Sequence, residues 1–87
     1  MKSQGGEMAS RNDMKVWVAA ALASMGGAAW PKEVAKYIWD NYEVEIRRSG
    51  SLLYTWQYDA RWAATVMRKE GVLKPVHGRT DKPWELA

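Results

Sequence analysis

The stretch that decides the fold runs from Tyr54 to Leu86 and reads YTWQYDARWAATVMRKEGVLKPVHGRTDKPWEL. Its first half predicts a helix over about Thr55 to Glu70, with Thr55 as the N-cap and Gly71 as a left-handed stop. Its second half predicts an antiparallel hairpin, in which residues 72–76 and 84–86 are the strands. A helix followed by such a hairpin predicts an α+β winged helix, a three-helix helix-turn-helix core with a small β-hairpin as the wing.

Helical spacing divides the predicted helix into two stripes. One stripe is apolar and is expected to face the core; it consists of Trp56, Ala60, Ala63, Val66 and Met67. The opposite stripe, with Tyr58 and Trp62 at its edges, is polar and basic; it consists of Gln57, Arg61, Thr65 and Arg68. Arg suits guanine, Gln suits adenine and Thr suits the thymine methyl group, so we expect this stripe to enter the major groove of DNA.

The tip of the hairpin concentrates the remaining cations. His77, Arg79 and Lys82 extend from a turn that Gly78 allows to bend, and Asp81 offsets part of the charge. We expect this wing to contact phosphates beside the groove, because such contacts orient a protein on its duplex.

Upstream of this stretch, the pattern predicts two more helices. The first starts at Asn12 or Asp13 and ends at Gly26-Gly27, and residues 28–30 form a minimal edge strand. Pro31 opens the second helix, which is expected to reach about Asn41. Its charged residues are expected to face water; they are Lys32, Glu33, Lys36 and Asp40.

Residues 47–51 are expected to form a flexible basic loop that contains Arg47 and Arg48. Residues 1–11 lack periodicity and are expected to be a disordered leader or an expression remnant. One winged-helix domain therefore covers residues 12–87.

The composition limits the function classes. A chain of 87 residues supports one small core, so most of its six Trp are expected to be structural, Trp84 included. The chain has no Cys and a single His, which leaves no convincing metal site, catalytic nucleophile or cofactor site, so we expect no enzyme. No apolar run is long enough to span a bilayer, so we expect no membrane partner and a cytoplasmic, intracellular protein.

The charge is unevenly placed. Residues 1–45 carry five Lys and Arg against six acids, a net charge of −1, and residues 46–87 carry eight against four, a net charge of +4. A basic half is typical of a protein that binds a polyanion, since phosphate contacts release counterions.

Three segments carry a family resemblance: LASMGG at 22–27, PKEV at 31–34 and RWAATVMRKEGVL at 61–73. In this order and spacing, over about residues 14–87, the chain resembles the N-terminal winged-helix domain of Mrr-type restriction proteins. The resemblance implies a specificity module that binds double-stranded DNA, including modified DNA, and works with a tethered or separate nuclease domain. This chain is expected to lack the nuclease itself.

A looser similarity to winged helices that read methylated adenine implies that an aromatic side chain packs on the base methyl group. The candidates for this contact are Trp56, Tyr58 and Trp62, together with Tyr54, although burial in the core competes for each Trp. Residues 82–84, Lys-Pro-Trp, also look like part of domains that bind left-handed DNA. Those domains use Asn and Tyr on the recognition helix, where this chain has Arg61 and Thr65.

The predicted DNA-binding residues lie on the loop, the helix and the wing: Arg47, Arg48, Tyr54, Gln57, Tyr58, Arg61, Thr65, Arg68, His77, Arg79 and Lys82. The alternative is a winged-helix module that binds another protein and does not touch DNA. Salt dependence of duplex binding separates the two, because phosphate contacts weaken steeply as salt rises.

Overall fold

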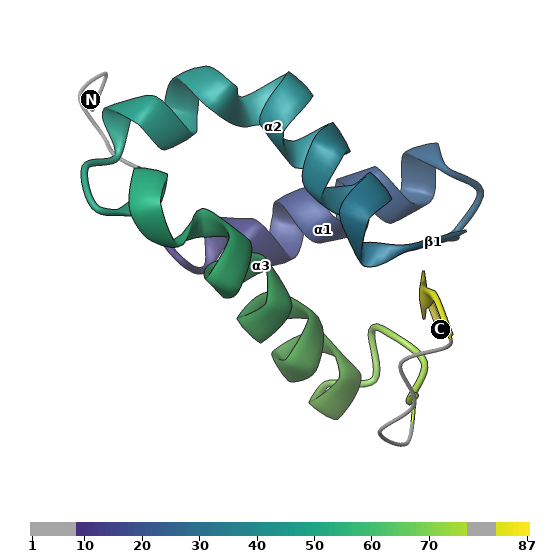
Figure 1. Cartoon of the computed structure of the whole chain (residues 1–87). Coiled ribbons are helices and arrows are strands. Elements are labelled where there is room, and N and C mark those ends of the chain that lie inside the picture. Colours follow the sequence, from purple (N-terminus) through teal and green to yellow (C-terminus); the bar gives the residue numbers. More distant parts are fainter. Residues whose placement is uncertain (1–8, 77–81) are drawn as a thin grey trace, which may run out of the picture.

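The computed structural model describes residues 9–76 and 82–87. Within these ranges the chain is a small α+β domain of three helices and a two-stranded antiparallel sheet (Figure 1). Its elements in chain order are α1 (Asp13–Ser24), β1 (Ala28–Ala29), α2 (Pro31–Arg48), α3 (Leu52–Lys69) and β2 (Trp84–Glu85). Helices α2 and α3 meet at a short loop, and α1 crosses behind both.

Helix α1 ends as its sequence predicts. The backbone N–H of Gly27 donates to the Leu22 carbonyl at 2.7 Å, and Gly26 and Gly27 have φ angles of 81° and 99°. Glycine adopts these positive φ angles without a Cβ clash, so the pair turns the chain from α1 into β1.

The C-terminal strand joins two distant parts of the chain. Trp84 pairs with Ala29, and Glu85 with Ala28, in antiparallel register. On its other side Leu86 forms an isolated bridge with Leu73, and the Lys74 N–H donates to the Glu85 carbonyl at 2.8 Å. The strand expected over residues 72–76 is thus reduced to a single bridge, while its expected partner 84–86 also pairs with β1.

The core lies where the three helices meet. Aliphatic side chains fill most of it. Two aromatic stacks pack at its edge, Trp17 on Tyr42 at 4.5 Å between ring centroids and Trp39 on Trp56 at 5.6 Å. Trp84 is buried, as predicted. Burial raises the pKa of Tyr42, and the neighbouring Tyr37 and Glu45 raise it further.

Two predicted boundaries between α2 and α3 were wrong. Helix α2 continues past Asn41 to Arg48 through a kink at Tyr42 (φ −127°), because Ile46 is fully buried and holds the last turns against the core. The expected loop over 47–51 therefore shortens, and Arg47 and Arg48 lie in the last helical turn.

Helix α3 begins three residues earlier than predicted. Leu52 is buried, which draws the first turn into the core, and Ser51 is the N-cap. Thr55 is therefore not a cap; it lies inside the helix, and its Oγ1 donates to Asp59 Oδ2 at 2.7 Å.

Among the described residues, no helix combines the length and apolar character needed to cross a membrane.

Candidate nucleic-acid interface

The outer face of α3 exposes aromatic, amide and basic side chains along one stripe. Tyr54 and Tyr58 are 85% and 70% exposed, one helical turn apart, and Arg61 and Thr65 continue the row at the next two turns. Gln57 lies beside this row and is also exposed. The structure thus brings together five of the predicted DNA-binding residues. We call Tyr54, Gln57, Tyr58, Arg61 and Thr65 the α3 stripe.

No carboxylate projects from this face. The only acid of α3 is Asp59, which is 8% exposed and points to the other side of the helix. Thr55 donates to one of its oxygens, and Arg11 Nε lies 3.6 Å from the other. The charge of Asp59 is therefore partnered inside the domain, and the α3 stripe presents only positive charge.

Several cations form no ion pair within residues 9–76 and 82–87: Lys32, Arg48, Arg61, Arg68, Lys69 and Lys82. Arg61 and Lys82 are exposed, so their charges face solvent. Arg68 differs, since it is partly buried and its Nε has no hydrogen-bond partner in the described part of the chain. An Arg in that position packs its aliphatic carbons against the core, so only part of its guanidinium is accessible to a ligand.

The aromatic candidates for a modified base divide into packed and open side chains. Trp56 is 8% exposed and stacks on Trp39, which places it in the core stripe. Trp62 is partly buried, and the Arg11 guanidinium lies 4.0 Å above its ring, so one face of the indole is covered. Tyr54 and Tyr58 are therefore the two aromatic side chains of α3 that lie most open to a base.

The remaining predicted residues lie away from this face or outside the described ranges. Arg47 pairs with Glu43 at 2.6 Å and lies over the Trp39 ring, so its charge is partnered within α2. Arg48 is exposed at the end of the same helix. His77 and Arg79 lie outside the described residues.

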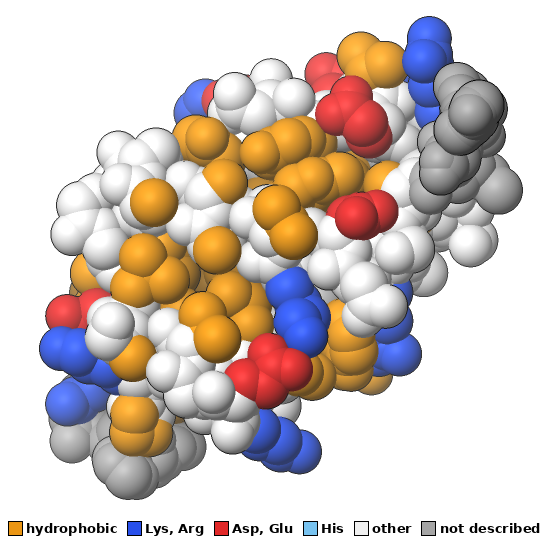
Figure 2. All heavy atoms as spheres, turned by 180° about the vertical axis from the view of Figure 1, so that it is seen from behind, with side chains coloured by type: hydrophobic (Ala, Val, Ile, Leu, Met, Phe, Trp, Pro, Cys, Tyr) orange, Lys and Arg blue, Asp and Glu red, His pale blue; other side chains and the backbone are white. Residues whose placement is uncertain are grey.

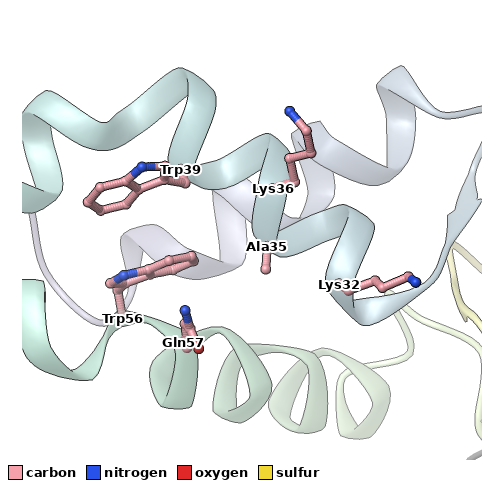
Figure 3. A pocket seen from close by; sticks show the side chains of 6 residues that line it. All are labelled: Lys32, Ala35, Lys36, Trp39, Trp56 and Gln57. Carbon is pink, nitrogen blue, oxygen red and sulfur yellow. The ribbon is translucent and has the colours of Figure 1, made fainter.

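A shallow cleft that is largely open to solvent runs along the seam between α2 and α3, and the sequence did not indicate it. Its first part has a volume of about 440 Å³ and is lined by Lys32, Ala35, Lys36, Trp39, Trp56 and Gln57. Figure 3 shows the Ala35 methyl group and the Gln57 amide facing one another across it, with the two indoles at one end. The second part, of about 310 Å³, is lined by Pro31, Lys32, Ala35, Gln57, Ala60, Arg61 and Trp84.

Lys32 and Lys36 are exposed, as predicted, but the sequence did not indicate that they border the cleft. Lys36 pairs with Asp40 at 2.6 Å and points away from α3, whereas Lys32 lines both parts of the cleft (Figure 3). The signal in the sequence is the spacing of residues 32, 35, 36 and 39, which places them on one side of a helix. Spacing alone does not predict that α3 lies beside that side of α2.

The reverse of the molecule differs in character. Figure 2 shows hydrophobic side chains forming a band across the middle of that face, with charged side chains around it. Among the described residues of α1, Val16 is 64% exposed. Neither DNA bases nor phosphates are matched by such a surface.

No family model, curated protein or solved structure matches this chain. Within the described residues, no group of three His, Asp or Glu side chains is placed to hold a metal ion.

Proposed function

We propose that this chain is a DNA-binding module of the winged-helix type, with α3 in the major groove. The observation that carries the proposal is the acid-free outer face of α3, where Arg61 stands among exposed Tyr and polar side chains. A face built for solubility would mix both signs of charge, as the outer face of α2 does. An exposed helix of this kind fits the major groove, which is about 12 Å wide.

The order of elements supports the winged-helix assignment. Three helices, a short strand between α1 and α2, and an antiparallel pairing of residues 73 and 86 after α3 follow the arrangement expected of this fold. The segment between these two pairing residues is the proposed wing. Its described end carries exposed Lys82, which suits a phosphate contact.

Three residues of the α3 stripe have roles in base recognition in the proposal. Arg61 donates two hydrogen bonds to guanine, Gln57 pairs with adenine, and Thr65 contacts a thymine methyl group or phosphate. Lys69 and Lys82 contribute charge toward the phosphates beside the groove.

The test is a titration of a labelled duplex at rising ionic strength. Several phosphate contacts predict a log–log plot of affinity against salt with a slope close to −0.9 per contact. If the chain binds no duplex even at low salt, the DNA-binding proposal is wrong.

The finer proposal is a specificity module of a restriction-type system that reads a modified base and works with a nuclease. Exposed Tyr54 and Tyr58 support it, since an aromatic ring packs well on a base methyl group. The same duplex with and without methylated adenine or modified cytosine decides the point. Tighter binding to one modified duplex is expected; equal affinity across the set leaves a general DNA binder.

The two exposed Tyr residues also support a second function, docking to another protein, because Tyr is enriched at protein interfaces. In that case Tyr58→Ala would abolish partner binding while Arg61→Ala would have little effect. For DNA the order is reversed, with Arg61→Ala the more damaging change.

A further inference from the structure

We propose that Arg11, which precedes α1 in the chain, is a further DNA-contacting residue and binds a backbone phosphate beside α3. The sequence gave no reason to include it, because it lies outside the helix, the loop and the hairpin that carry the predicted contacts. The inference rests on the proposed function, since it adds one contact to the same interface.

The contact with Trp62 brings Arg11 to the edge of the α3 stripe. The guanidinium carbon of Arg11 lies 4.0 Å from the centroid of the Trp62 ring. Trp62 follows Tyr58 by four residues and precedes Thr65 by three, so the three side chains are neighbours on the surface of α3. Helical spacing sets Trp62 and Gln57 on opposite flanks of the stripe. Arg11 therefore occupies the flank of α3 that faces away from the cleft.

The backbone that carries Arg11 is fixed to the rest of the domain. The Ala9 N–H donates to Ser49 Oγ at 2.9 Å, and the Ser10 N–H donates to Asp13 Oδ2 at 2.8 Å. With these bonds on one side and the Trp62 ring below its guanidinium, Arg11 is positioned before any ligand arrives. A positioned side chain loses less conformational entropy on binding than a free one.

The guanidinium of Arg11 keeps its hydrogen-bonding capacity. Its ion-pair partner Asp59 lies 3.6 Å from Nε, beyond the roughly 3.2 Å limit of a well-formed N–H···O bond. Its side chain donates no hydrogen bond to any described residue. The Arg11 side chain is 49% exposed and that of Asp59 11%, so an approaching ligand meets the cation and not the acid. Phosphate oxygens match the planar fork of donors that Arg presents.

Arg47 shows how an Arg in similar surroundings differs when its donors are satisfied within the domain. It also lies over an indole, that of Trp39, at 5.3 Å from the ring centroid, and it also pairs with an acid. Its Nε, however, donates to Glu43 at 2.6 Å, and the Glu43 side chain is itself partly exposed. Arg11 has neither a short bond to its acid nor an exposed acid beside it. The difference favours a contact outside the domain for Arg11.

The test compares Arg11→Gln with Arg47→Gln in titrations of a labelled duplex at rising ionic strength. Loss of one phosphate contact should reduce the salt slope by about 0.9, which corresponds to roughly eightfold weaker binding at 0.1 M salt and to no difference near 1 M. Arg47→Gln removes the same charge, also from above an indole, and should leave the slope unchanged. Equal effects of the two variants would mean that net charge alone matters and would overturn the inference.

The conservative variant Arg11→Lys separates a phosphate contact from a purely structural role. It keeps the charge that releases counterions, so the salt slope of the unaltered chain should return. A slope as low as that of Arg11→Gln contradicts the inference. Urea denaturation of each variant gives the folded fraction, and a loss of affinity that disappears after correction for this fraction assigns Arg11 to stability instead.

Failure of the inference can be told from failure of the proposed function. If Arg11→Gln binds the duplex with the affinity and slope of the unaltered chain, Arg11 is not part of the interface and the DNA-binding function stands. If the unaltered chain binds no duplex at low salt, both are wrong.

Discussion

Helices α2 and α3 have the same length, 18 residues, and treat their charges in opposite ways. Helix α2 pairs its charges internally, Lys36 with Asp40 and Arg47 with Glu43, each at 2.6 Å and four residues apart. Helix α3 has no ion pair within itself; its one acid, Asp59, is partnered by Thr55 and by Arg11 from outside the helix.

The difference shows how one domain separates stability from recognition. Ion pairs four residues apart stabilise a helix by about 0.2 to 0.5 kcal/mol each, a contribution that α3 forgoes. Helix α3 instead buries more of its length; its buried residues are Leu52, Trp56, Asp59, Ala60, Ala63, Ala64 and Met67. Because the inner side supplies the stability, the cations of the outer side stay available for a ligand.

The largest effect is expected when the inner side of α3 is broken. Trp56→Ala removes a buried indole and its stack on Trp39, so it should lower the free energy of unfolding by about 3 to 5 kcal/mol. Tyr58 lies two residues further along α3 and is 70% exposed. The Tyr58→Ala change should therefore alter the free energy of unfolding by less than about 0.5 kcal/mol. Urea denaturation of both variants is the measurement, and similar losses would show that α3 is not divided into two functional sides.

The next effect concerns binding and sets the two helices against each other. Arg61→Ala should weaken specific duplex binding by about 1 to 3 kcal/mol and non-specific binding by less, since a base contact is lost. Arg47→Ala is the matched control on α2, where Glu43 already partners the charge. Fluorescence anisotropy with a specific and an unrelated duplex checks this; an Arg47 effect as large as that of Arg61 would contradict the comparison.

The core and the sidedness of α3 could be predicted from the sequence, because helical spacing fixes which side chains share a face. Trp56, Ala60, Ala63 and Met67 are buried as their stripe indicated, and Trp84 closes onto the core. Val66, predicted on the same stripe, is only partly buried, so that part of the prediction was wrong. The helix ends between α2 and α3 could not be predicted, since the burial of Ile46 and Leu52 overrides local signals in the sequence 47–51. Capping and loop residues report only the local preference of the backbone. Here tertiary packing overrides that preference and moves the helix ends.

The candidate site was predictable on one helix and not between two. The exposure of Tyr54, Tyr58 and Arg61 follows from their register on α3. The cleft needs Lys32 and Ala35 of α2 to lie beside Gln57, and a contact between helices is set by packing of the whole domain. The contact of Arg11 with the Trp62 ring is also set by packing of the whole domain, because the two residues are far apart in the chain.

A smaller effect is expected at the proposed wing. Lys82→Ala should weaken specific and non-specific binding alike and reduce the salt slope by about 1, since it removes a phosphate contact and no base contact. Arg79→Ala should do the same. Lys36→Ala serves as the control, because its charge is already held by Asp40, and its salt slope should match that of the unaltered chain. A change in base preference on loss of Lys82 would place that residue in the groove instead.

The smallest effect tests whether internal pairing is what keeps α2 from taking part. Asp40→Asn releases Lys36, a residue that borders the cleft but whose charge points away from α3, and should raise duplex affinity by less than about 1 kcal/mol, mostly at low salt. Glu45→Gln is the matched control, because it removes the same charge from α2 without releasing a cation from any ion pair of the described residues. If both variants raise the affinity equally, net charge alone governs binding; a gain confined to Asp40→Asn shows that the release of a paired cation is the feature that matters.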